Sequence, residues 1–183
     1  MKKNIYGLLF FLVCISSCNE NKKNTKNTVN ADSMQAAALI ENLKTIITQN
    51  PDSAGLRLKL VFALDSINNQ KEALLQIDSL IKDDSLNYGL WFTKGQLAEN
   101  AADTLLAMKS YVKAAKIYES PDALLSLANL YAETKNERAI TICSRVKALG
   151  QGKEMDANCD FIIGFHVSIV LSNALVKKMQ CCL

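Results

Sequence analysis

Apolar residues recur at three- and four-residue spacings through most of this chain, and short polar breaks separate one such stretch from the next. This spacing places apolar side chains along one face of a helix, whereas the alternation typical of strands is absent before residue 160. Pro51 ends the first stretch, which contains Leu39, Ile40 and Leu43. Short breaks between helices favour antiparallel neighbours. The pattern predicts an all-α chain with helices over 56–66, 70–82, 88–100, 104–118, 121–134 and 137–149.

The predicted helices repeat with a period close to 34 residues. Small or branched residues stand in phase, namely Val61, Gly95 and Ala128 on the first helix of each pair and Ala73, Ala107 and Ala139 on the second. Small residues allow helices to approach closely, and we expect Trp91, Tyr111 and Tyr131 to fill the spaces beside them. One helix pair cannot bury its apolar face alone, so this repetition predicts at least about three stacked pairs.

The spacing resembles the tetratricopeptide repeat, a family of 34-residue helix–turn–helix units. The unit over 88–120 matches best, with Trp91, Gly95, Ala107, Tyr111 and Ala114 on the family's aromatic and small positions. The resemblance implies a right-handed α-solenoid domain over 32–183, built from a half repeat over 36–51 and repeats over 54–87, 88–120 and 121–150. The departures from the family pattern are Arg57, Ser85 and Lys94, and a generic α-helical bundle is the alternative.

The end of the chain is less regular. Residues 156–164 have the pattern of a further first helix, and residues 165–176 are apolar and rich in β-branched side chains. We expect a packed pair of capping helices over 156–183, with a truncated or altered end as the alternative. His166, Ser168 and Ser172 interrupt the apolar run, which makes it a poor candidate for a membrane span.

The first residues have the order of an export signal. Lys2 and Lys3 precede about eleven apolar residues over 5–15, which is too few to span a bilayer. The segment closes on Ser16, Ser17 and Cys18, and this resembles the lipobox of bacterial lipoproteins. The resemblance implies that residues 1–17 are removed and that the Cys18 thiol carries a diacylglycerol, with palmitate among the acyl chains. An ordinary cleaved signal with a chance cysteine is the alternative.

The segment after Cys18 is polar. Residues 19–31 hold five Asn and three Lys and almost nothing apolar, so we expect 18–31 to be a flexible tether between membrane and domain. The formal charge of the whole chain is +3, and two of its lysines leave with the signal. Binding of nucleic acid needs clustered Lys and Arg, so this near-neutral body argues against it.

The residues that could carry chemistry form no recognisable catalytic or metal-binding motif. His166 is the single histidine and lies in an apolar run, which favours a core residue over a general base. Cys143 and Cys159 have no metal-ligand spacing, and we interpret them as buried thiols, with a disulfide between them as the alternative. We therefore predict no enzyme, no metal and no small-molecule cofactor. Loss of an activity in His166→Ala with the fold intact would support the enzyme hypothesis.

The family resemblance implies a concave groove lined by the first helix of each pair. The corresponding positions are Leu58, Phe62 and Asp65, then Phe92, Gln96 and Glu99, then Leu125 and Asn129. None of them is basic, so we expect no clamp for a peptide carboxylate. Apolar rings and amides suit an extended or helical peptide. The alternative is that Leu58 and Phe62 are core residues.

These observations predict a lipid-anchored scaffold in a bacterial envelope that faces the periplasm from the outer membrane and recruits another protein. The alternative is an accessory lipoprotein of an uptake system that binds a substrate or a polymer.

Overall fold

The computed structural model describes residues 24–180, with side chains over 34–174, and contains eight helices and no strand in that part of the chain. The six helices predicted between residues 56 and 149 are confirmed, with ends that differ by at most about two residues. The elements are α1 Asn24–Gln49, α2 Ala54–Ser66, α3 Gln70–Asp83, α4 Tyr88–Asn100, α5 Thr104–Ile117, α6 Pro121–Glu133, α7 Arg138–Ala148 and α8 Lys153–Gln180.

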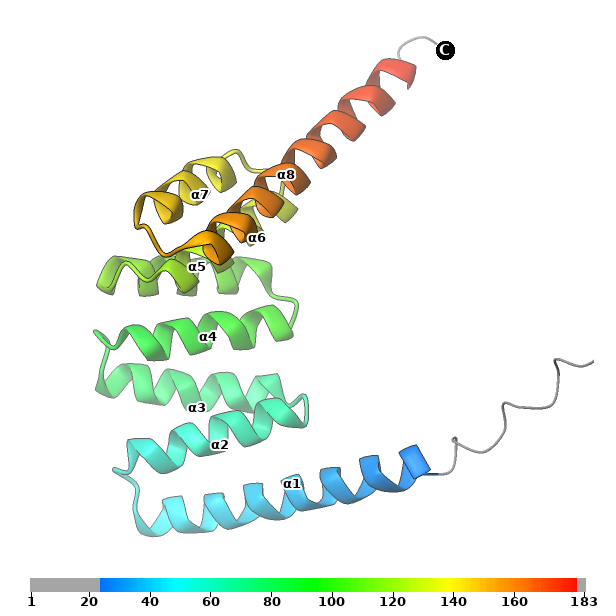
Figure 1. The fold of residues 1–183 in the computed structure, drawn as a ribbon. Helices are drawn as coiled ribbons and strands as arrows, with labels where there is room; N and C mark the ends of the chain where they lie inside the picture. Colours follow the sequence, from blue (N-terminus) through cyan, green and yellow to red (C-terminus); the bar gives the residue numbers. More distant parts are fainter. Residues whose placement is uncertain (1–23, 181–183) are drawn as a thin grey trace, which may run out of the picture.

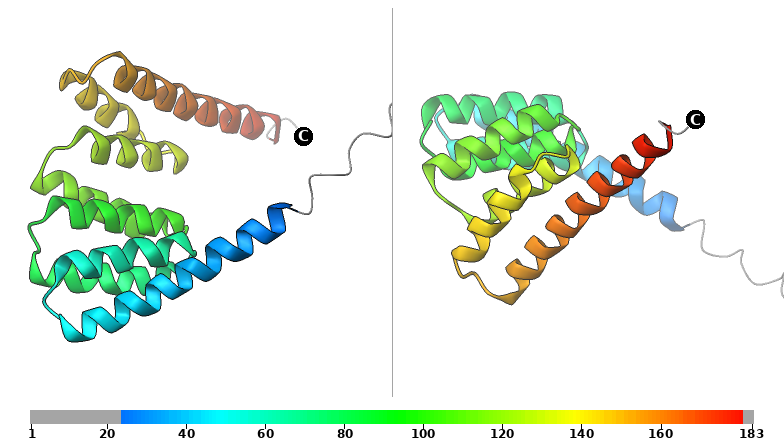
Figure 2. Two further views of the ribbon diagram at one scale, coloured as in Figure 1. Left: turned by 60° about the horizontal axis from the view of Figure 1, so that its bottom comes forward. Right: turned by 90° about the horizontal axis from the view of Figure 1, so that it is seen from above.

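The helices stack in the order of the sequence, each against its neighbours (Figure 1). Helix α8 packs against both α6 and α7. The pairs α2–α3, α4–α5 and α6–α7 are the three predicted units, and α1 precedes them as a lone second helix. The predicted all-α solenoid is therefore confirmed. The free ends of the longer helices α1 and α8 project from the same side of the stack (Figure 2).

Helix starts are fixed by short polar side chains. Ser53, Asn69, Asn87 and Asp103 each accept a hydrogen bond from the backbone N–H three residues further on, which satisfies one of the free donors at a helix N-terminus. The acceptor–donor distances lie between 3.0 Å at Asp103 and 3.4 Å at Ser53. These caps explain why the polar breaks of the sequence end where each new helix begins.

The turn within each helix pair uses one residue in the left-handed region. Asn68, Ala102 and Lys135 have φ values of 59°, 57° and 60°. They stand 34 and 33 residues apart, so the turn geometry repeats with the same period as the sequence. The three helix pairs therefore share one turn conformation, as expected of equivalent units.

The core consists of two clusters of buried side chains that meet at α4. The N-terminal cluster includes Ile40, Leu60 and Ile77, and the C-terminal cluster includes Tyr111 and Leu127. Leu97 belongs to the first cluster and its neighbour Ala98 to the second. Each helix pair therefore buries its apolar face against the next pair, as expected for a stack of repeats.

The expected pair of capping helices is wrong, because residues 153–180 form the single helix α8. The segment has no proline, and one glycine, Gly164, costs only about 1 kcal/mol in a helix interior. Nothing in it therefore breaks the helix. Within the described residues, the stretch Lys153–Ala174 of α8 is long and apolar enough to cross a membrane, by length and composition only.

The N-terminal segment also differs from the prediction. Helix α1 begins at Asn24, so residues 24–31 of the expected tether are helical. They contain no proline or glycine, and a helix that is already held by packing at Ile40 and Leu43 extends at little cost. The signal over 1–17, Cys18 and residues 19–23 lie outside the described residues.

Candidate functional site

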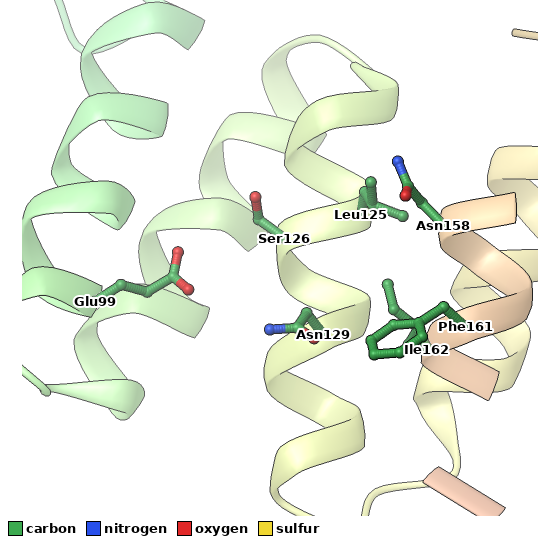
Figure 3. Close-up of a pocket in the computed structure, with 7 residues that line it drawn as sticks. All are labelled: Glu99, Leu125, Ser126, Asn129, Asn158, Phe161 and Ile162. Atoms are coloured by element: carbon green, nitrogen blue, oxygen red, sulfur yellow. The ribbon is translucent and has the colours of Figure 1, made fainter. Parts of the chain in front are cut away.

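A cavity of about 300 Å³ is lined by residues of α4, α6 and α8, with α6 between the other two helices (Figure 3). Its lining residues are Glu99, Leu125, Ser126, Asn129, Asn158, Phe161 and Ile162. Three of them, Glu99, Leu125 and Asn129, are among the predicted groove residues. The first helices of consecutive units therefore share one face, and this face is hollowed between the second unit and α8.

Glu99 is held in place from beneath the cavity. The hydroxyl of Tyr111, a fully buried side chain, donates a hydrogen bond to the Glu99 carboxylate. Burial of the phenol raises the pKa of Tyr111 well above its ordinary value, and the hydrogen bond and charge of Glu99 raise it further. Tyr111 therefore stays a donor over the physiological range and fixes the carboxylate, which points from α4 toward α6 (Figure 3).

Amide side chains form the polar part of the cavity wall. Asn129 on α6 donates a hydrogen bond from Nδ2 to Glu133 Oε1 over 2.9 Å, and this contact orients its amide. Asn158 on α8 is exposed. Amides carry both donors and acceptors, so such a pair can bond the backbone of an extended peptide in either direction.

The apolar part of the wall comes from α6 and α8. Leu125 is half-buried, and Phe161 has 74% of its surface exposed. The ring of Phe161 stacks on that of Phe165, with centroids 6.5 Å apart and planes within 9°. Exposed apolar patches often mark interaction sites, and aromatic side chains are enriched at protein interfaces.

The other predicted groove residues lie outside this cavity. Phe62 is 52% exposed on α2, and Gln96 is exposed on α4. Asp65 accepts hydrogen bonds from Asn100 Nδ2 at 3.1 and 3.2 Å, which links α2 to α4. The contribution of these residues to partner binding stays a prediction.

Two apolar groove candidates also take part in packing. Leu58 is half-buried against the N-terminal cluster. The ring of Phe92 lies 5.6 Å from that of Tyr111 and 5.8 Å from that of Tyr88, centroid to centroid. Phe92 is therefore a poor position for a test substitution, because its loss would disturb the core.

The prediction missed the cavity residues Ser126, Asn158, Phe161 and Ile162. A signal for one of them was present in the sequence. Groove candidates stand four residues apart on each first helix, at 58 and 62, 92 and 96, and 125 and 129. Leu125 stands three residues before the small residue Ala128, and Asn129 stands one residue after it. The same two offsets from Gly164 give positions 161 and 165, which are the stacked phenylalanines.

The buried cysteines are free thiols in the structure, as the sequence favoured. Cys143 on α7 and Cys159 on α8 are fully buried. Burial raises the pKa of Cys143 to about 12, with a smaller contribution from Cys159, and burial also raises the pKa of Cys159. Thiolates are the nucleophilic form of cysteine, so these thiols are unreactive at neutral pH.

His166 is 3% exposed, as expected of a core residue, and its Nδ1 has no hydrogen-bond partner among the described residues. In residues 34–174 no three His, Cys, Asp or Glu side chains come together in a way that could hold a metal ion.

Comparison with known proteins supports the fold. No family model and no curated protein matches the chain. The solved structures that are similar to it include two of MamA. One has a TM-score of 0.59 and 16% identity over 85% of this chain and 88% of its own. The other has a TM-score of 0.57 and 14% identity over 85% of this chain and 98% of its own. At such identities the likeness shows the fold alone, an all-α solenoid.

Proposed function

We propose that this chain is a lipid-anchored scaffold that recruits a partner protein by binding a peptide segment on its concave face. The observation that carries the proposal is the cavity lined by α4, α6 and α8, whose lining combines an exposed phenylalanine with two amides and a carboxylate. Solenoids of helix pairs offer extended concave surfaces for such binding.

The cavity lining indicates the kind of peptide. Leu125, Phe161 and Ile162 would receive one apolar side chain, while Asn129 and Asn158 bond the adjacent backbone. A volume of about 300 Å³ suits one or two side chains and not a folded domain. Glu99 is the only charged residue of the lining, so the site favours a neutral or basic segment over a C-terminal carboxylate.

The anchor in this proposal is the lipidated Cys18. Two or three acyl chains hold a protein firmly, since each buried methylene contributes about 0.8 kcal/mol. The residues after Cys18 and the projecting helix α1 would set the solenoid away from the bilayer. The protein would then face the periplasm, from the outer membrane.

Crosslinking capture in the native host, read by mass spectrometry, tests the recruitment. The full-length protein is compared with Phe161→Glu, which puts a charge in the apolar part of the cavity wall, and with Leu75→Glu as a matched control. Leu75 is 64% exposed on α3, outside the cavity. We expect one dominant partner that Phe161→Glu loses and Leu75→Glu retains. A partner retained by Phe161→Glu, or no partner above background, contradicts the proposal.

The stacked rings of Phe161 and Phe165 also fit the second candidate, an accessory lipoprotein that binds a substrate or a polymer of an uptake system. Aromatic platforms favour flat, weakly polar faces such as those of sugars. Binding of soluble oligosaccharides from the host's growth substrates by the full chain, abolished in Phe161→Ser, would favour this candidate over peptide recruitment.

A further inference from the structure

A second and larger hollow of about 590 Å³ follows the outer surface of α5. It shares no lining residue with the cavity of the concave face. Its apolar wall includes Trp91 from α4, Tyr131 from α6, and Leu105, Met108 and Val112 from α5. Leu105 is 71% exposed, so the solenoid leaves apolar surface open here. We call this hollow the α5 groove.

Lysines line the α5 groove beside this apolar wall. Lys109, Lys113 and Lys116 are exposed and follow one another at spacings of four and three residues, so they form one stripe along the helix. Leu105, Met108 and Val112, at spacings of three and four, form the neighbouring apolar stripe. The groove is therefore amphipathic along its length.

These three lysines have no counter-charge of their own. Among the described residues none of them has a carboxylate within 4.0 Å. Lys94 differs, because its Nζ lies 2.6 Å from Asp78 and 5.4 Å from the centre of the Trp91 ring. Like charges one turn apart on a helix repel each other, so a ligand with negative charges at the same spacing would relieve that repulsion.

We propose that the α5 groove binds an acidic amphipathic helix of a partner protein. Its apolar stripe would enter the groove, and its carboxylates, one turn apart, would face Lys109, Lys113 and Lys116. The stretch from residue 105 to 116 is about 16 Å long at the usual rise, which corresponds to about three turns of a partner helix. Recognition of a helix by a groove with matching stripes is an established mode of binding.

The shape and charge of the groove favour this occupant over two others. A flat bilayer surface cannot enter a recess, so the apolar wall would stay uncovered on an anionic membrane. A fatty acid has one carboxylate, which needs one cation. The α5 groove has three lysines within about 7 residues, or roughly 10 Å of helix. A row of charges at helical spacing is complementary to another helix.

The test uses the full-length protein in detergent micelles and a fluorescein-labelled synthetic peptide of fourteen residues. The peptide carries Leu at three- and four-residue spacings with Glu on the adjacent stripe, and a second peptide has Lys in place of each Glu. Fluorescence anisotropy gives the affinities. Trp91 is the single tryptophan of the chain and lines the groove, so a blue shift of its emission on adding unlabelled peptide locates the binding.

We expect the Glu peptide to bind at least tenfold more tightly than the Lys peptide and to shift the Trp91 emission. The variant Lys109→Gln/Lys113→Gln/Lys116→Gln should bind it about tenfold more weakly, the summed effect of three exposed ion pairs. The matched variant Lys59→Gln/Lys71→Gln/Lys82→Gln, which changes exposed lysines outside the groove, should stay within twofold of the wild type.

Three results would overturn the proposal. One is equal affinity of the wild type and the groove variant for the Glu peptide. Another is equal affinity of the two peptides for the wild type. The last is a Trp91 shift that appears only when the micelles contain phosphatidylglycerol or oleate and that is lost in the groove variant. This result would assign the groove to lipid. All three lysines are exposed, so the groove variant is expected to fold, and circular dichroism checks this.

Discussion

Gly95 on α4 lies against the ring of Tyr111 on α5 so closely that a Cβ atom added at Gly95 would stand 2.4 Å from Tyr111 Cε1. Real Cβ atoms do not approach other heavy atoms to that distance. Tyr111 is fully buried and its hydroxyl holds Glu99, so the ring cannot move aside without disturbing the candidate site. Close packing against Tyr111 therefore requires the small residue that the repeat pattern has at position 95.

Gly95→Ala should lower the free energy of unfolding by about 1–2 kcal/mol. Overpacking destabilises the fold by about 1–3 kcal/mol, and the better helix propensity of alanine offsets at most about 1 kcal/mol of this loss. Gly164→Ala on α8 is the matched control, because nothing lies within 4 Å of its added Cβ. The control should stabilise by about 0.5–1 kcal/mol. Urea unfolding measures both, and equal stabilisation by the two changes would contradict the close packing of Gly95.

Ala102→Gly should raise the free energy of unfolding by about 0.5–1 kcal/mol. Ala102 has φ of 57° in the turn between α4 and α5, a conformation that strains residues with a Cβ. The neighbouring Ala101 has φ of −82°, so Ala101→Gly removes no strain and should destabilise. Thermal unfolding of both variants checks the prediction, and a loss of stability in Ala102→Gly would show that the turn is not left-handed.

Stability should fall as the pH rises from about 9 toward 12. The folded state raises the pKa of Cys143 from 9.0 to about 12, so the unfolded chain loses its proton first and binds fewer protons than the folded chain in that window. Stability therefore decreases with pH there and is fully present below about pH 9. The buried phenol of Tyr111 adds to the effect at the upper end.

Urea unfolding under reducing conditions at several pH values measures this slope. Cys143→Ala should flatten it, although the variant is less stable throughout because of its cavity. Tyr118→Phe is the control, since Tyr118 is 62% exposed, and its slope should match that of the wild type. A Cys143→Ala slope equal to that of the wild type would contradict a buried, protonated thiol at this position.

Cys18→Ala should release the protein from the membrane. In the wild-type chain we expect labelled palmitate to be incorporated and the protein to sediment with membranes, and the variant should do neither. The helix α8 offers a second route to the membrane by its length and composition. Sedimentation of Cys18→Ala with membranes would contradict a lipid anchor as the sole attachment and would assign that role to α8.

The sequence predicted the body of the fold because its signals are local. Apolar spacing defines the helices from 56 to 149, and Ser53, Asn69, Asn87 and Asp103 mark where four of them begin. The ends of the chain could not be predicted in this way. Helix propensity over 24–31 and 165–176 is moderate, so packing at one end of α1 and α8 decides how far each helix extends.

The candidate site was predicted in part. The positions of Glu99, Leu125 and Asn129 follow from the repeat register, and the structure brings them to one cavity. Phe161 joins them because α8 packs against α6 as well as α7, a tertiary contact that no spacing within one helix reveals. Likewise, the packing of Phe92 depends on Tyr111, which lies on a different helix, α5.

We propose that the concave face recruits a partner, and a photocrosslinking scan in the native host examines this face residue by residue. A photoreactive amino acid is placed at Phe62, Gln96, Asn129 or Phe161 on the first helices and α8, and at Leu75 or Ile140 on the second helices α3 and α7. We predict one common crosslinked partner from Asn129 and Phe161 and none from Leu75 or Ile140. Crosslinks to the same protein from Leu75 and Ile140, with none from Phe161, would contradict recruitment by the concave face.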